Sequence, residues 1–429
     1  MQSWKRHLYS VAPRTNSVGN APLFKVRCEP SNHRRNCSFE LTGGIGPIER
    51  SKMKSNSSLS GINRRVLLSG LAMLPALSGL PFSAIAQTQT GVSLGSWNEG
   101  PAKQAIFDFV RATTDEGSSK FVPLQERIAT FDQDGTLWVE HPIYSQVVYC
   151  LDRVPALAEK DPTLKDVEPF KTVLSGNREA IAKLSLHDLE KVLFATLSGM
   201  SVDDFEAEVK KWLASAKDGR WKRPFTELIY QPMLELMQYL RSNGFKTYIV
   251  TGGGQDFVRV YSERVYGVQP EQVVGSAEGT KYGYQKDGTP FLTKEPKLLL
   301  NDDNAGKPEG IHLMIGRRPR AAFGNSDGDR EMLEYTGAGD GARLMMLVMH
   351  DDAQREYAYG PAQGLPETKV GAFSQSLYDE AKKKNWIVIS MKNDWKRVFA
   401  SGFSAQPWVS EHTSEADEGS PRAPIPAET

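Results

Sequence analysis

Residues 128–138, Ile-Ala-Thr-Phe-Asp-Gln-Asp-Gly-Thr-Leu-Trp, determine how the rest of the chain is interpreted. A short apolar run predicts a buried strand, and two aspartates, Asp132 and Asp134, follow it directly. Gly135 then allows a tight turn. In a parallel α/β sheet, ligands bind beyond the carboxyl ends of the strands. We therefore expect both carboxyl groups at a cleft, too close together to ionise independently unless a cation or a proton intervenes.

Three further segments follow in an order that supports this interpretation. A strand pattern at 245–251 ends in Thr-Gly-Gly, with Thr251 as its last residue. Lys307 lies near an expected helix start, and a strand pattern at 320–324 precedes the cluster Asn-Ser-Asp-Gly-Asp at 325–329. Each segment alone carries little information. Because they follow the first segment in this order, they argue against the alternative that Asp132 and Asp134 belong only to a surface Asx turn.

The series resembles the four motifs of the haloacid dehalogenase superfamily. Its members are mostly Mg²⁺-dependent phosphohydrolases that use an aspartate nucleophile. The resemblance covers roughly residues 125–350. It implies an α/β fold, in which a Rossmann-like parallel sheet core has helices on both faces and carries an inserted all-helical cap.

The pattern of apolar residues supports the same fold. Strand patterns alternate with helical ones, which argues for a parallel sheet covered by helices. These strand patterns lie at 127–132, 245–251, 272–276, 320–324, 343–349 and 386–391. We expect the core at 87–136 and 245–400, with a β-hairpin at 280–295. Residues 137–244 show helical spacing and almost no strand pattern, and by resemblance to the phosphoserine phosphatase branch they are the cap.

The resemblance assigns the catalytic roles. Asp132 is the nucleophile, and Asp134 protonates the leaving oxygen and later activates water. Thr251 and the Gly252 backbone N–H bind phosphoryl oxygens, and Lys307 neutralises their charge. These residue types suit phosphoryl transfer, which depends on positioning and on positive charge around the phosphoryl oxygens.

The resemblance also implies a Mg²⁺ site made of Asp132, the Asp134 backbone carbonyl and the first position of the fourth motif. Here that position is Asn325 rather than an aspartate. An amide oxygen can coordinate Mg²⁺ but brings no charge, so we expect weaker metal binding unless Asp327 or Asp329 compensates. We expect Asp329 to bind the metal directly or through water. Asp327 is an alternative helix cap.

Substrate contacts are expected just past the nucleophile, at Trp138, Glu140 and Tyr144. Glu140 lies one position short of the substrate-binding glutamate of phosphoserine phosphatases, which weakens the case for phosphoserine. His350 ends a strand on the same sheet edge and is a further candidate. We expect a secreted Mg²⁺-dependent phosphatase that hydrolyses a small phosphomonoester through an aspartyl phosphate. The alternatives are a phosphotransferase of the same superfamily and a catalytically weak binding module, which Asn325 alone favours.

The N-terminal part of the sequence suggests export. Asn-Arg-Arg-Val-Leu-Leu at 63–68 begins a twin-arginine pattern, and an apolar run follows up to Ala-Ile-Ala at 84–86. We interpret 53–86 as a signal peptide, because the run is too short and too interrupted by Gly and Pro for a transmembrane helix. Residues 1–52 are basic and polar, so they are either a non-native extension before Met53 or a disordered one. Residues 401–429 are expected to be a disordered tail.

The net charge argues against two classes of partner. The chain has 52 basic and 52 acidic residues, and residues 1–86 contain 12 of the basic and 3 of the acidic ones. The remainder therefore has 40 basic and 49 acidic residues, a formal net charge of −9. This argues against binding to nucleic acid or to an anionic membrane. Cys150 is the one cysteine after residue 86 and is expected in the core rather than as a nucleophile.

We predict export by the twin-arginine machinery to the periplasm or beyond, without a stable membrane anchor, and a mature chain that begins near Gln87. N-terminal sequencing of the native protein checks this. A chain that begins before residue 53 would contradict both the cleavage and the start at Met53.

Overall fold

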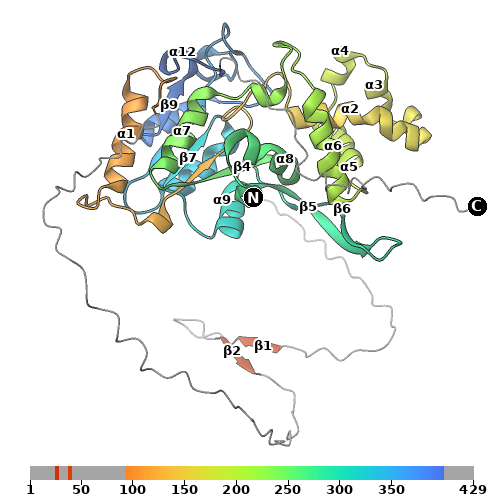
Figure 1. Cartoon of the computed structure of the whole chain (residues 1–429), viewed down its shortest axis with the longest axis horizontal. Helices are drawn as coiled ribbons and strands as arrows, with labels where there is room; N and C mark the ends of the chain where they lie inside the picture. The colour runs from red at the N-terminus through yellow and green to blue at the C-terminus, as the bar shows by residue number, and fades with distance from the viewer. Residues whose placement is uncertain (1–24, 29–36, 41–92, 401–429) are drawn as a thin grey trace, which may run out of the picture. The chain divides into compact units, whose positions relative to one another are not determined.

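The computed structural model describes residues 25–28, 37–40 and 93–400 (Figure 1). The expected signal peptide, the tail at 401–429 and most of the N-terminal extension lie outside the described residues. Within that extension, β1 (Lys25–Cys28) and β2 (Cys37–Glu40) pair antiparallel, although we expected no regular structure there. Among the described residues, no helix is long and apolar enough to cross a bilayer.

Within residues 93–400, one seven-stranded sheet has the order β6-β5-β4-β3-β7-β8-β9. All neighbouring strands are parallel except β5 and β6, which confirms the expected α/β class. The bounds are β3 (Ile128–Phe131), β4 (Lys246–Gly254), β5 (Val273–Tyr284), β6 (Pro290–Leu300), β7 (Ala321–Gly324), β8 (Leu344–Met349) and β9 (Ile387–Ser390).

Both faces of the sheet are covered, because successive strand residues point to opposite sides. Along β4, Ile249 belongs to one apolar cluster and Val250 to another, and both are fully buried. Phe131 of β3 stacks on Phe323 of β7, with ring centroids 4.4 Å apart. The core helices are α1 (Pro101–Thr114), α7 (Gln231–Ser242), α8 (Gln255–Tyr266), α9 (Gly306–Gly310), α10 (Arg330–Gly337), α11 (Gln375–Lys383) and α12 (Met391–Asp394).

The insertion after β3 is helical, as expected. It contains α2 (Ser145–Lys160), α3 (Phe170–Leu174), α4 (Arg178–Ala182), α5 (Leu186–Leu197) and α6 (Val202–Ser215). Ser185 and Ser201 cap α5 and α6 by accepting backbone N–H bonds. Cys150 of α2 is fully buried, as a core residue. Helix α7, which we placed in the cap, packs instead against β4 and belongs to the core.

Short single-turn elements connect these helices and strands. They are η1 (Leu124–Glu126), η2 (Pro162–Asp166), η3 (Phe225–Glu227), η4 (Pro270–Gln272), the π-helical η5 (Ile311–Ile315), η6 (Asp327–Asp329) and η7 (Ala362–Gly364).

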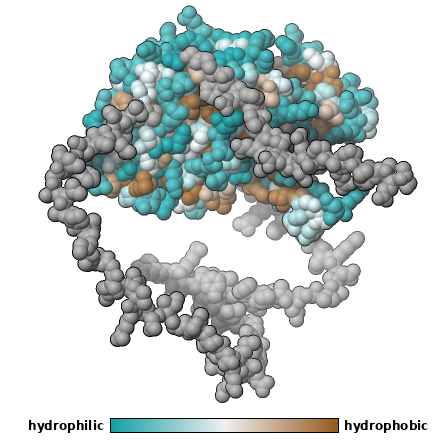
Figure 2. Space-filling view, in the orientation of Figure 1, coloured by the Kyte–Doolittle hydropathy of each residue, from teal (hydrophilic) through white to brown (hydrophobic). Residues whose placement is uncertain are grey.

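The expected hairpin is longer than its sequence pattern. Strand β5 continues without a break from the sheet into the hairpin, and β6 returns antiparallel to it. The backbone of β6 holds the insertion, since Gly199 N–H donates to the Lys294 carbonyl and Lys294 N–H donates to the Met200 carbonyl. The helical insertion is thus fixed to the same sheet that carries the aspartates. On the face shown in Figure 2, hydrophilic side chains predominate and apolar ones form separate brown areas.

Candidate active site

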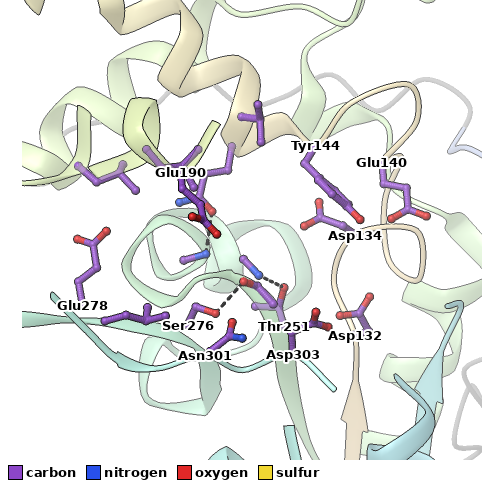
Figure 3. A pocket seen from close by; sticks show the side chains of 18 of the residues that line it. Asp132, Asp134, Glu140, Tyr144, Glu190, Thr251, Ser276, Glu278, Asn301 and Asp303 are labelled. Atoms are coloured by element: carbon purple, nitrogen blue, oxygen red, sulfur yellow. Dashed lines mark hydrogen bonds between the residues drawn. The ribbon is translucent and has the colours of Figure 1, made fainter. Parts of the chain in front are cut away.

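A cavity of about 370 Å³ opens at the carboxyl ends of β3 and β4 (Figure 3). The core contributes Asp132, Asp134, Thr251, Gly252 and Lys307 to its lining. Helices α2 and α5 of the insertion contribute the opposite wall. The structure therefore brings together the four expected catalytic residues beneath the insertion.

Asp132 is buried, with 7% of its surface exposed, directly after β3. Its backbone N–H donates to the Phe323 carbonyl at 2.9 Å, which extends the β3–β7 pairing to the aspartate itself. The chain then turns at Gly135, whose φ is 76°. A Cβ at that position would lie 2.2 Å from Asn325 Nδ2, so both conformation and space require glycine.

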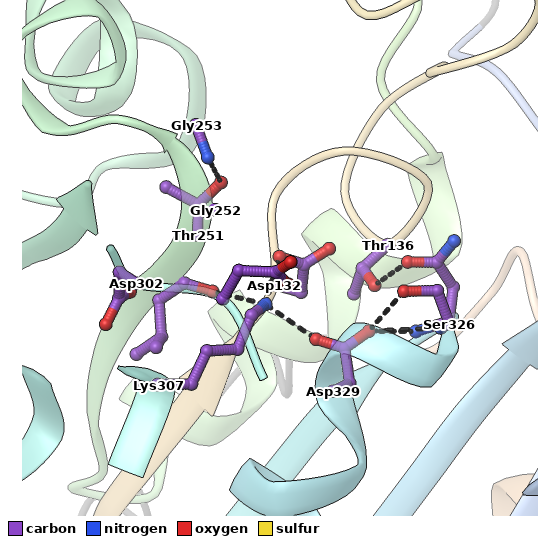
Figure 4. A network of polar contacts seen from close by, with 12 residues as sticks. Asp132, Thr136, Thr251, Gly252, Gly253, Asp302, Lys307, Ser326 and Asp329 are labelled. Carbon is purple, nitrogen blue, oxygen red and sulfur yellow. Dashed lines mark hydrogen bonds and ion pairs between the residues drawn. The ribbon is translucent and has the colours of Figure 1, made fainter. Parts of the chain in front are cut away.

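Lys307 joins three of the motifs (Figure 4). Its Nζ lies 2.5 Å from Asp132 Oδ1, 2.6 Å from Asp329 Oδ1 and 3.1 Å from the Val250 carbonyl oxygen. Burial alone would lower the pKa of Lys307, but Asp132 and Asp329 raise it above its ordinary value. The lysine is therefore a fixed cation at the floor of the cavity.

Asp329 has a different role from the expected metal ligand. Its Oδ1 accepts from Lys307, and its Oδ2 accepts the backbone N–H groups of Asn325 and Ser326 at 2.9 and 3.0 Å. It is fully buried and does not line the cavity. A Cβ at Gly324 would lie 2.4 Å from Asp329 Cγ, so the close approach needs glycine. Asp329 orients Lys307 and the loop that follows β7.

Trp138 also departs from its expected role. Its side chain is fully buried and stacks on Tyr261, with ring centroids 4.7 Å apart. The indole N–H donates to Asp134 Oδ1 at 2.6 Å. Trp138 thus orients Asp134 and does not line the cavity. Burial raises the pKa of Asp134 to about 6, so this carboxyl can hold a proton near neutral pH.

Asn325 and Glu140 form a pair that the motif pattern did not predict. Asn325 Nδ2 donates to Glu140 Oε1 at 2.7 Å, and the Thr136 hydroxyl donates to Asn325 Oδ1 at 3.1 Å. The Tyr359 hydroxyl also donates to Glu140 Oε1, at 2.9 Å. Glu140 lines the cavity, as expected, and burial and then Asp134 raise its pKa well above the usual range.

The remaining candidates divide between cavity and scaffold. Thr251 Oγ1 accepts the Gly253 N–H at 3.1 Å, and Tyr144 Oη accepts the Gly371 N–H at 3.2 Å; both side chains line the cavity. His350 does not line it. Its Nε2 lies 2.8 Å from the Gly135 carbonyl oxygen, so His350 supports the nucleophile loop from behind.

The charge balance at this end of the cavity fits a cation. Asp132, Asp134 and Glu140 face the cavity, and Lys307 is the one cationic side chain among the described lining residues. Burial and then Asp329 raise the pKa of Asp132, whereas Lys307 lowers it. Of the residues expected to hold Mg²⁺, Asp132 and Asp134 line the cavity and could do so, whereas Asn325 is fully buried, does not line the cavity, and its amide oxygen accepts from Thr136. Between residues 93 and 400, no group of three or more His, Cys, Asp or Glu forms a ready-made metal cluster.

A family model for haloacid dehalogenase-like hydrolases matches residues 129–334, which include all four motifs. This segment is a haloacid dehalogenase-like hydrolase domain. No curated protein matches the chain. The matched segment contains Asp132, Asp134, Thr251 and Lys307, whereas Tyr359, which holds Glu140, lies beyond it.

The hydrolase domain is similar in structure to proteins from several bacteria. A protein of unknown function from Bordetella pertussis Tohama I is 16% identical, over 62% of this chain and 98% of that one, with a TM-score of 0.39. A phosphoserine phosphohydrolase-like protein from Francisella tularensis is 18% identical, over 52% and 88%, with a TM-score of 0.30. A probable phosphoserine phosphatase from Vibrio cholerae is 14% identical, over 54% and 58%, with a TM-score of 0.30.

We predict that Asp134→Asn stabilises the cation-free protein at about pH 8 but not at about pH 4. A raised pKa means that the ionised carboxylate destabilises the fold. This loss of stability is fully present when the pH is above the folded-state pKa of about 6. It disappears as the pH falls toward the ordinary pKa of 3.8. Because the side chain is partly accessible, we expect on the order of 1 kcal/mol. Denaturant unfolding in a chelator measures it, with the exposed Asp108→Asn as control. An equal effect at both pH values would contradict the assignment.

We predict that Asn325→Asp raises Mg²⁺ affinity about tenfold, roughly 1.4 kcal/mol, because it adds a carboxylate to the site. It should also lower the unfolding temperature without cation, since the new carboxylate faces Glu140 where Asn325 Nδ2 now donates. Calorimetric titration and thermal unfolding measure the two effects. Adding Glu140→Gln should restore the cation-free stability. If Asn325→Asp leaves both quantities unchanged, residue 325 does not face the cation.

Proposed function

We propose that the protein is a Mg²⁺-dependent phosphatase that hydrolyses a small phosphomonoester through an aspartyl phosphate on Asp132. The observation that carries the proposal is the placement of Asp132 and Asp134 on one loop at the cavity, with Thr251 and Lys307 facing the same space. A nucleophile, an acid, a hydroxyl donor and a fixed cation are the groups that phosphoryl transfer requires.

In the first step, a carboxylate oxygen of Asp132 attacks phosphorus and the bond from phosphorus to the leaving oxygen breaks. Asp134 gives its proton to that oxygen, so an alcohol leaves. The raised pKa of Asp134, about 6, suits a carboxyl that must be protonated for this step. Trp138 holds Asp134 Oδ1, which keeps the acid aimed at the cavity.

In the second step, water attacks phosphorus and gives a proton to the Asp134 carboxylate. The bond between phosphorus and Asp132 breaks, inorganic phosphate leaves, and both aspartates return to their first state. The Thr251 hydroxyl and Lys307 stabilise the phosphoryl oxygens in both steps. Bound Mg²⁺ would offset the repulsion between the Asp132 carboxylate and the phosphoryl oxygens.

We also propose that the enzyme acts after export by the twin-arginine route, in the periplasm or outside the cell. The support for this is the twin-arginine pattern at 63–68 and the cleavage signal at 84–86. The enzyme would then bind its small phosphorylated substrate in the periplasm or outside the cell.

We predict that Asp132→Asn lowers kcat for an aryl phosphate by at least about 10³-fold, because the amide is a poor nucleophile. Steady-state assays with Mg²⁺ measure this. Asp303→Asn is the matched control, since Asp303 lines the same cavity but has no assigned role, and it should stay within tenfold of wild type. Thermal unfolding confirms that both variants fold. Turnover of Asp132→Asn within tenfold of wild type would overturn the nucleophile assignment.

A further inference from the structure

Part of the cavity lining is an apolar wall. Val147 of α2, Leu193, Phe194 and Leu197 of α5, and Leu298 of β6 contribute to it. Phe194 and Leu298 are 36% and 44% exposed. Large apolar side chains that remain exposed in a concave site favour an apolar ligand group.

The same part of the cavity has no cation to receive a second anionic group. Among the described lining residues, the acids outnumber the single cation, and that cation, Lys307, already binds Asp132 and Asp329. Glu190 and Glu278 lie at the end of the cavity opposite to Asp132 and Glu140 (Figure 3). A carboxylate on the leaving group would therefore face acids without a partner.

Part of this negative charge is compensated outside the cavity. The buried Lys294 lies 3.2 Å from Glu278 and also pairs with Asp256, which lies 3.8 Å from Arg259 as well. Glu190 is largely exposed at the rim. Among the described lining residues, this end of the cavity thus presents Glu190 and Glu278 and no cation.

We propose that the substrate is a phosphomonoester whose alcohol is partly apolar and carries no negative charge. This inference rests on the proposed phosphatase activity and specifies its leaving group. It disfavours phosphoserine, sugar bisphosphates and other substrates with a second anionic group. Uncharged and ammonium-bearing alcohols are both compatible with the end of the cavity that presents Glu190 and Glu278.

Two matched pairs of compounds test the charge requirement with the whole enzyme and Mg²⁺. Phosphoethanolamine differs from phosphoserine by one carboxylate, and phenyl phosphate differs from 4-carboxyphenyl phosphate in the same way. We expect kcat/KM to be at least about tenfold higher for the carboxylate-free member of each pair. Equal or reversed values within both pairs would overturn the inference while leaving the phosphatase proposal intact. Absence of turnover for all four would contradict the phosphatase proposal itself.

Two substitutions test the apolar wall. Phe194→Ser should lower kcat/KM for phenyl phosphate at least about fivefold, but change that for methyl phosphate less than twofold. Leu299→Ser is the matched control, because Leu299 is 63% exposed on β6 and does not line the cavity. Leu299→Ser should leave kcat/KM unchanged for both substrates. An equal loss for both substrates in Phe194→Ser, or the same pattern in Leu299→Ser, would overturn the role of the wall.

Discussion

The buried ammonium of Lys307, shared between Asp132 and Asp329, is the interaction on which the site depends. All three side chains are at least nine-tenths buried, so neither carboxylate could keep its charge there without the lysine. Removing one partner from such a buried pair typically costs about 3–5 kcal/mol. The same contacts fix the direction of the Asp132 carboxylate, so stability and nucleophile geometry depend on one cluster.

Sheet topology explains why residues far apart in sequence meet at this cluster. β3 lies between β4 and β7, and all three are parallel, so their carboxyl ends open at one edge. Asp132 follows β3, Thr251 lies in β4, and Asn325 follows β7. The return of β6 along β5 then holds the helical insertion over that edge. The apolar wall and the phosphoryl site therefore lie in one cavity although different parts of the chain form them.

The sequence was sufficient to predict the α/β class, the strands around β3 and the meeting of Asp132 with Lys307, because strand patterns and motif order determine them. It did not predict the engagement of Asp329 with Lys307 or the burial of Trp138. Both depend on side-chain directions that spacing does not specify. The sequence also did not predict the Glu140–Asn325 contact. The position of Glu140 depends on Tyr359 and Gly371, which lie against it and come from a part of the chain more than 200 residues away. The glycines at 275, 279 and 283 interrupt the apolar pattern of β5. Its continuity with the hairpin was therefore not evident.

The central claim is that Asp132 becomes phosphorylated, and trapping that species tests it most directly. Asp134→Asn removes the group that activates water, and an activated aryl phosphate needs little acid for its leaving group, so the intermediate should accumulate. Acid quenching followed by mass spectrometry of the peptides locates the phosphoryl group. The account predicts one phosphoryl group on Asp132, with one equivalent of phenol released. A phosphoryl group on another residue, or phenol released in repeated turnovers without any phosphorylated peptide, would contradict it.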